Sequence, residues 1–327
     1  MSSEDEIPVR CSIRQLDAES WVIGGCILLS RTTSSNPSGT TWSDGKGAYF
    51  TVSYSQEAPP PGALPPTDGP IKLVHDVGDA SAVWSIGDAF LKVHKLDSTD
   101  ISITREHTTL EYLHGPSRPK LTFPTPRYLF HAEFGGRYYL VTSRIPGQTL
   151  EAVWPTMEEL DKQICVDRIV DICKELVLYG GKSTAICGVD GKHIYENWLS
   201  RPGQADKGPR AQLDSCTELG MDCSDLVLSH NDMGPQNVIV DLARTRTDKE
   251  SSIGIIDWEM AGFVPRAWIR TKFRICGAMD LDFPGHTDED GMSERVEWRR
   301  RVQRKLEEEG FPEVSSAYMD RLHMLPT

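Results

Sequence analysis

The sequence predicts an α+β fold in two lobes, a small β-rich N-terminal lobe and a larger, mostly helical C-terminal lobe. Short apolar runs separated by glycine-containing turns crowd into residues 71–145, which is typical of strands. After residue 148, apolar residues recur at helical spacing. The length of 327 residues suits two lobes. We therefore expect an N-terminal extension (1–70), a β-rich lobe (71–145) and a helical lobe (146–327).

Composition excludes several classes of protein. The formal net charge of −13 disfavours nucleic acid or an anionic membrane surface as a partner. No apolar run approaches the roughly 18 residues that cross a bilayer, and the acidic start is not a secretory signal. The eight cysteines form no CxxC pair, which favours a reduced protein. We expect a cytoplasmic protein with no membrane and no nucleic-acid partner.

The first 70 residues contain two stretches rich in aromatic and β-branched residues, 20–30 and 48–53. They predict a hairpin or two loose strands. A proline-rich run at 58–66 predicts a stiff, extended spacer. We expect this extension to have a structural role. A cap, a substrate contact and a poorly ordered leader are the alternatives.

Three short strand candidates open the β-rich lobe, at 71–75, 82–86 and 89–93. In the third, Leu91 and Val93 share one face, so Phe90 and Lys92 share the other. A helix is expected over about 100–114, where apolar residues recur at helical spacing before Gly-Pro. A further strand at 138–147 leads into the second lobe.

In the helical lobe, three apolar runs predict strands: Leu226–Leu228, 238–240 and Ile253–Ile256. The first ends on a cluster that holds His230, Asp232 and Asn237, and the last ends on Asp257. A hairpin would bring Asp232, Asn237 and Asp257 to one end of a small sheet.

Phosphoryl transfer from a nucleotide uses such a trio. One carboxylate holds the acceptor hydroxyl and takes its proton, while an amide oxygen and a second carboxylate hold magnesium against the phosphates. Asp232 and Asn237 are five residues apart, which is the spacing of the protein-kinase catalytic loop. Asp257 follows Asn237 by twenty residues, enough for one hairpin. We interpret His230 as a residue that braces the loop.

Two motifs resemble those of the aminoglycoside phosphotransferases, the choline kinases and their fungal relatives. The family's His-x-Asp-x-x-x-x-Asn loop is similar to residues 230–237, and its Ile-Asp-Trp/Phe run is similar to residues 256–258. Glycine is commonest after the histidine, and Asn231 stands there instead. The resemblance covers about residues 71–270. It implies a protein-kinase-like fold and a kinase that uses ATP and Mg²⁺.

The resemblance also implies roles for individual residues. Asp232 would be the catalytic base, and Asn237 and Asp257 the metal ligands. Lys92, held by Glu106, would neutralise the phosphates. The remaining nucleotide contacts would come from the phosphate loop that includes Gly78 and Ser81 and from the adenine-binding backbone of Thr142, Ser143 and Arg144.

Two further features of the helical lobe predict scaffold. Thr156 and Glu159 form a capping box ahead of a long helix that ends at Gly180-Gly181. Apolar residues recur every four positions through the basic run at 299–306, which indicates an amphipathic helix with a solvated charged face.

The sequence indicates the phosphate donor more clearly than it indicates the acceptor. The acceptor would be a small metabolite with a hydroxyl or amine group. Two other functions stay open: a non-catalytic binding scaffold, and a scaffold reused for other chemistry such as a cyclisation in secondary metabolism. A protein kinase is disfavoured because no activation segment ending in Ala-Pro-Glu follows Asp257.

Overall fold

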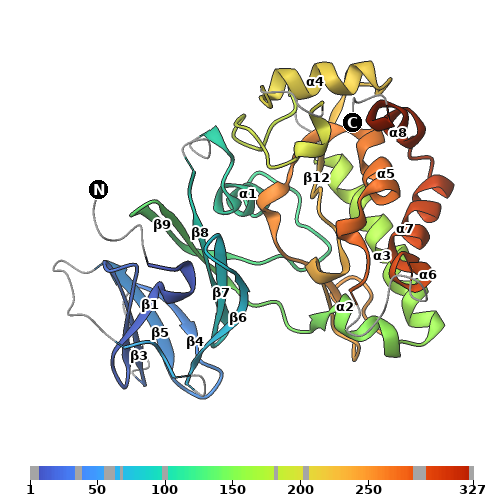
Figure 1. The fold of residues 1–327 in the computed structure, drawn as a ribbon. Coiled ribbons are helices and arrows are strands. Elements are labelled where there is room, and N and C mark those ends of the chain that lie inside the picture. The colour runs from blue at the N-terminus through green and yellow to red at the C-terminus, as the bar shows by residue number, and fades with distance from the viewer. Residues whose placement is uncertain are drawn as a thin grey trace. The chain divides into compact units, whose positions relative to one another are not determined.

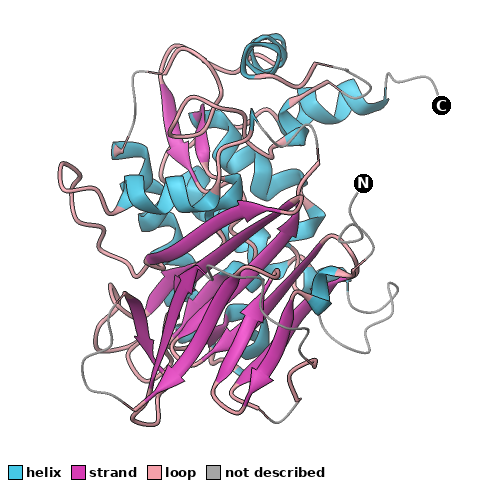
Figure 2. Cartoon of the chain, turned by 90° about the vertical axis from the view of Figure 1, so that its left-hand side faces the viewer, coloured by secondary structure: helices cyan, strands magenta, loops and turns pink. Residues whose placement is uncertain are grey.

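The computed structural model describes residues 7–33, 39–54, 63–66, 69–97, 102–179, 183–201, 206–282 and 292–323. The chain forms two compact units. Unit 1 comprises Met1–Ile101 and Pro126–Arg144, and unit 2 comprises Ser102–Thr125 and Ile145–Thr327. Strands fill unit 1 and most helices belong to unit 2 (Figures 1 and 2). The predicted α+β class, with a β-rich part and a helical part, is confirmed.

The first sheet of unit 1 is larger than the sequence indicated. Where a hairpin or two loose strands were expected, five antiparallel strands pair in the order β1-β2-β3-β5-β4. Serine and threonine within these strands mask the apolar alternation that identifies a strand. The proline-rich run expected as a spacer lies partly outside the described residues. The strands are β1 (Ile13–Asp17), β2 (Ser20–Ile23), β3 (Ile27–Thr32), β4 (Thr40–Ser43) and β5 (Tyr49–Tyr54).

The second sheet of unit 1 contains the three predicted strands, each slightly longer than expected. Its strands are all antiparallel and run in the order β6-β7-β8-β10-β9. Their bounds are β6 (Ile71–Val77), β7 (Ser81–Ile86), β8 (Ala89–Lys95), β9 (Tyr128–Phe134) and β10 (Arg137–Ser143).

The two sheets of unit 1 share one hydrophobic core. Trp21 and Phe50 from the first sheet belong to the same buried cluster as Trp84 and Leu91 from the second. The indole Nε1 of Trp42 also donates to the carbonyl of Ile86, at 2.7 Å. Strands β1 to β5 therefore have a structural role, since without them the second sheet would expose its apolar face to water.

Unit 2 is built mainly of helices. The expected helix over 100–114 is α1, which begins later, at Glu106, and belongs to unit 2 in the observed division. Helix α1 spans Glu106–Leu113. The other helices are α2 (Leu150–Val153), α3 (Glu159–Leu178), α4 (Pro209–Glu218), α5 (Arg266–Ile275), α6 (Met292–Arg295), α7 (Glu297–Glu308) and α8 (Ser315–His323).

The capping box predicted for α3 is wrong. Its N-cap is Glu158, and no described side chain caps it. Thr156 instead ends a 3₁₀ turn, where its hydroxyl donates to the carbonyl of Val153 at 3.1 Å. The predicted end at Gly180-Gly181 lies outside the described residues, and α3 itself ends at Leu178.

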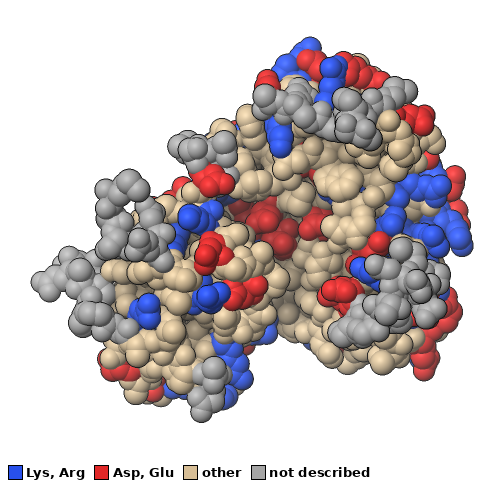
Figure 3. All heavy atoms as spheres, viewed as in Figure 1, with Lys and Arg blue, Asp and Glu red and all other residues tan. Residues whose placement is uncertain are grey.

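Helix α7 has the predicted amphipathic form. Trp298, Val302 and Leu306 are fully buried along one face. Basic and acidic atoms lie side by side on its outer face (Figure 3). None of the helices in the described part of the chain is long and apolar enough to cross a membrane.

Two small sheets in unit 2 carry the loops of interest. The predicted strands are β12 (Leu226–Ser229), β13 (Val238–Val240) and β14 (Ile253–Ile255). Strands β13 and β14 pair as a hairpin, and β11 (Gln148–Thr149) joins on the other edge of β13. Strand β12 pairs instead with β15 (Gly262–Pro265), which the sequence did not indicate.

The turn between β4 and β5 yields a pH prediction. The Asp44 carboxylate accepts from Arg31 Nε at 2.9 Å and from the backbone N–H groups of Lys46 and Ala48. Burial favours a higher pKa for Asp44, but these donors outweigh it and lower the pKa to about 2. A lowered pKa in the folded state stabilises the fold above the unfolded pKa and ceases to do so as the pH falls.

We therefore expect Asp44→Asn to unfold at a lower urea concentration than wild type at pH 7. The difference between the two proteins should shrink as the pH falls from about 4 towards 2, because the wild-type carboxylate then becomes protonated. A difference that does not change with pH would contradict this assignment.

Candidate active site

The loop after β12 holds Asp232 and Asn237 against one another. Asn237 ends a 3₁₀ turn (Pro235–Asn237), and its Nδ2 donates to both the carbonyl oxygen and Oδ2 of Asp232, each at 2.9 Å. Because the amide nitrogen faces Asp232, Asn237 Oδ1 points elsewhere and is the oxygen that could bind a cation. The expected convergence of these two side chains is therefore present.

His230 joins this loop (residues 230–237), which we call the catalytic loop after its expected role, to the loop after β14. The backbone N–H of Asp232 donates to His230 Nδ1 at 3.2 Å, so Nε2 carries the proton and donates to the carbonyl of Ile256 at 2.9 Å. The ring is buried and packs edge-on against Trp258, with 4.7 Å between the centroids. His230 thus has the bracing position expected for it.

Asp257 opens the second loop (residues 257–260), which we call the metal loop after its expected role. Its backbone is left-handed, with φ of 67°, which is uncommon for a residue other than glycine. The preceding Ile256 N–H donates to the carbonyl of Asn237 at 3.0 Å, and the following Trp258 N–H donates to Glu106 Oε1 at 3.2 Å. Backbone contacts on both sides thus hold Asp257 next to Asn237 and Glu106.

Three carboxylates meet at this loop. One oxygen each from Glu106, Asp257 and Glu259 lies within 4.8 Å of the others. Oxygen ligands at this separation suit a hard divalent cation such as Mg²⁺, which binds through carboxylates. The donor set therefore fits the expected metal. Glu106 therefore lies beside the metal loop, although its expected role was as a partner of Lys92.

The predicted phosphate-binding residues lie in unit 1. Gly78 turns the chain between β6 and β7 with φ of 57°, and Ser81 is the first residue of β7 rather than part of the loop. In β8, Leu91 and Val93 are buried in the core, whereas Lys92 lies on the less buried face, as expected. A contact between Lys92 and Glu106 would join the two units and stays a prediction.

The backbone expected to bind adenine is already engaged within unit 1. Thr142 and Ser143 belong to β10, and Ser143 N–H donates to the carbonyl of Arg127 at 2.9 Å. Arg144 N–H donates to the carbonyl of Asp88 at 2.8 Å. An adenine contact from this stretch must therefore use backbone groups other than these two donors.

Burial dominates the electrostatics of Asp232. It raises the pKa of the carboxyl, the nearby Asp257 raises it further, and the Lys272 ammonium and Asn237 amide oppose them. The net shift is upward. A carboxylate with a raised pKa is a stronger base, which suits a group that accepts a proton from an alcohol.

Part of this chain is similar to a known protein family. The model of the phosphotransferase enzyme family (APH) matches residues 78–268, which is more than half of the chain. The chain belongs to the phosphotransferase enzyme family. All the predicted site residues lie within the matched range, whereas the first sheet of unit 1 lies outside it.

Solved structures with similarity to this phosphotransferase include an aminoglycoside phosphotransferase, APH(3'')-Id from Streptomyces rimosus. It is 17% identical, with 77% of this chain and 92% of that chain covered and a TM-score of 0.43. The same enzyme was also solved with ADP and streptomycin. Monomeric WbdD matches at 15% identity (63% and 38% covered, TM-score 0.35), and the BubR1 kinase domain at 13% (58% and 46%, TM-score 0.32).

Comparison with curated protein sequences gave no significant match. None of these similarities identifies a substrate for this phosphotransferase.

Sequence reasoning missed a buried ion pair behind the catalytic loop. Lys272 of α5 donates to Glu196 Oε2 at 2.5 Å, and both side chains are almost fully buried. Burial raises the pKa of Glu196, and the Lys272 ammonium opposes that rise. Lys272 follows Trp268 by four residues and so shares its buried helix face, which was the available signal. Basic residues surround Lys272 in the sequence, so the sequence alone did not distinguish it from a solvent-exposed charge.

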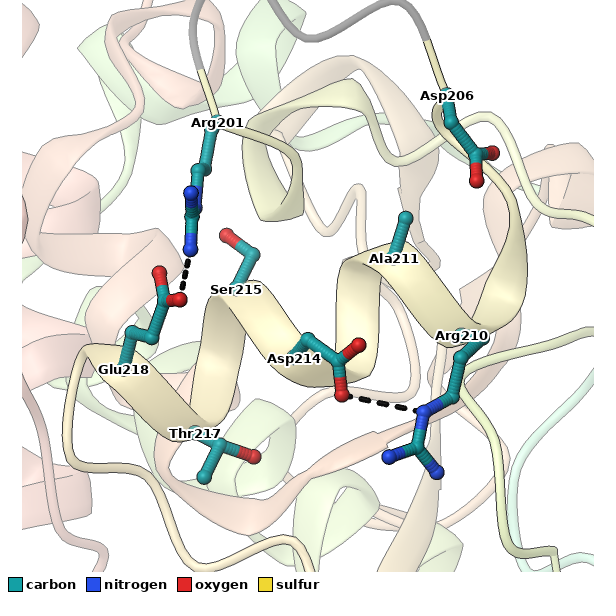
Figure 4. Close-up of a pocket in the computed structure, with 8 residues that line it drawn as sticks. All are labelled: Arg201, Asp206, Arg210, Ala211, Asp214, Ser215, Thr217 and Glu218. Atoms are coloured by element: carbon teal, nitrogen blue, oxygen red, sulfur yellow. Dashed lines mark ion pairs between the residues drawn. The ribbon is translucent and has the colours of Figure 1, made fainter.

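A further cavity of unit 2 lies elsewhere, on α4. It measures about 610 Å³, and its described lining includes none of the predicted site residues. Four of its charged side chains form ion pairs, Arg210 with Asp214 at 3.1 Å and Arg201 with Glu218 (Figure 4). We assign it no role in the chemistry.

The buried pair yields a stability prediction. Lys272→Met should lower the free energy of unfolding by about 3–5 kcal/mol, because it leaves the Glu196 carboxyl buried without its cation. Adding Glu196→Gln should restore most of the loss, since no buried charge then remains. Urea unfolding followed by circular dichroism measures both variants.

Lys174→Met is the matched control, because Lys174 forms an ion pair with Glu309 at 2.8 Å near the surface. It should unfold close to wild type. A double variant as unstable as Lys272→Met alone would show that the pair acts through its packing and not through its charges.

Proposed function

We propose that this phosphotransferase is an ATP-dependent small-molecule kinase that transfers the γ-phosphate to a hydroxyl or amine group of a metabolite. The observation that carries the proposal is the hydrogen-bonded link between Asp232, Asn237 and the backbone beside Asp257. This link supports the proposal because phosphoryl transfer requires a base and oxygen ligands for a metal side by side.

In this proposal Asp232 orients the acceptor and takes its proton. Asn237 uses its Nδ2 to hold the Asp232 carboxylate, and its Oδ1, together with Asp257, would hold Mg²⁺. The ion, when bound, would neutralise charge on the transferring phosphate. Glu106 and Glu259 add carboxylates to the same place, so either could complete the coordination.

In this proposal, residues of unit 1 bind the nucleotide. Lys92 would neutralise phosphate charge, with Glu106 as its expected partner. The turn at Gly78 and Ser81 would contact the phosphates, and the stretch from Thr142 through Ser143 to Arg144 would contact the adenine. We propose that the enzyme is cytoplasmic and that its partner is the small acceptor molecule. We expect it to bind neither nucleic acid nor a membrane.

The test is phosphate transfer from γ-labelled ATP, with Mg²⁺, to a broad panel of alcohols and amines. Wild type should label at least one acceptor class. Asp232→Ala should lower turnover by about 100-fold to 10,000-fold, because it removes the proton acceptor. Its melting temperature should stay near that of wild type.

Asp214→Ala on the exposed face of α4 is the matched control, and it should keep full turnover. Binding of Mg-ATP with no transfer to any acceptor would favour the non-catalytic scaffold. Wild type that neither binds ATP nor transfers phosphate would overturn the proposal.

The metal ligands can be tested without an acceptor. Mg-ATP should raise the melting temperature of wild type, since a ligand that binds the folded state stabilises it. Asp257→Asn should lose most of the part of this shift that depends on Mg²⁺, because an amide binds the cation less strongly than a carboxylate. An undiminished Mg²⁺-dependent shift would remove Asp257 from the metal site.

A further inference from the structure

Asn231 lies between His230 and Asp232 in the catalytic loop. Its φ is 65°, in the left-handed region, which asparagine tolerates better than most residues. Its side chain is buried, with 5% of the residue exposed. The position therefore accepts a side chain, and that side chain points into the protein.

The amide of Asn231 reaches across to the metal loop. Its Nδ2 donates to the carbonyl of Met260 at 3.0 Å, and Met260 ends the 3₁₀ turn (Trp258–Met260) that follows Asp257. His230 binds the carbonyl of Ile256 on the other side of Asp257. Two neighbouring side chains of the catalytic loop therefore hold the metal loop at both of its ends.

A small cavity lies next to Asn231. Among the described residues, Asn231 Oδ1 is buried and accepts no hydrogen bond. Asn231 lines, with Ser229 and Lys272, a space of about 10 Å³. This is about the least volume that holds one water molecule. The Lys272 ammonium has three N–H donors, and Glu196 accepts from one of them.

We propose that Asn231 is a positioning residue that locks the metal loop to the catalytic loop, with its Oδ1 bridged to Lys272 through one buried water molecule. The lock complements His230: one residue holds the chain before Asp257, and the other holds it after. Glycine at this position would permit the same backbone but make neither contact. The consequence for metal binding rests on the proposed function, whereas the contact itself does not.

Native-state hydrogen exchange tests the contact. In Asn231→Gly, which keeps the left-handed backbone accessible, amides of residues 258–262 should exchange about tenfold faster than in wild type. Asn231→Asp removes the amide donor without adding glycine flexibility, and it should have the same effect. Asn197→Gly changes an exposed asparagine and should leave these amides unchanged.

Binding of Mn²⁺ with ADP, followed by electron paramagnetic resonance, tests the positioning role. Asn231→Gly should weaken Mn²⁺ binding about tenfold, whereas Asn197→Gly should not, and both variants should melt near wild type. Unchanged exchange at 258–262 would overturn the proposal. Faster exchange with unchanged Mn²⁺ affinity would overturn the positioning role.

The two proposals fail separately. If wild type binds no Mn²⁺, the proposed function fails, and the exchange experiment still decides whether Asn231 links the loops.

Discussion

The hydrogen bond from His230 to the carbonyl of Ile256 connects two loops that lie 26 residues apart in the chain. Each loop follows a strand of only three or four residues, which is too short to fix the direction of a side chain beyond its end. The imidazole supplies that constraint because its two nitrogens contact both loops at once. Burial against Trp258 excludes water that would compete for these bonds. The placement of Asp232 and Asp257 depends on it.

The same region concentrates negative charge. Glu106, Asp257 and Glu259 lie close together, and burial, with a smaller contribution from Asp257, raises the pKa of Asp232. Like charges at such distances repel, so the arrangement favours a bound cation. Within unit 2, Lys272 offsets part of the repulsion from behind the catalytic loop, and Glu196 holds it there. The buried pair thus serves both the fold and the electrostatics of the site.

The sequence predicted the parts whose pattern is local. Strands β12, β13 and β14 lie in short apolar runs, and α7 repeats its apolar residues every four positions. It failed where partners are distant or the pattern is masked. Strand β15 contains glycine and proline, the first five strands contain serine and threonine, and Lys272 lies among basic residues. The capping box failed because Thr156 had a local partner in the preceding turn. Contacts such as Asn231 with Met260 have no signature in a single sequence.

The decisive experiment is a crystal structure with Mg²⁺ and a non-hydrolysable ATP analogue. We expect one magnesium ion to bind Asn237 Oδ1 and a carboxylate oxygen of Asp257, each at about 2.1 Å. Asp232 should then lie beside the terminal phosphate without binding the ion. An ion held elsewhere, or a nucleotide whose phosphates lie away from Asp257, would contradict it.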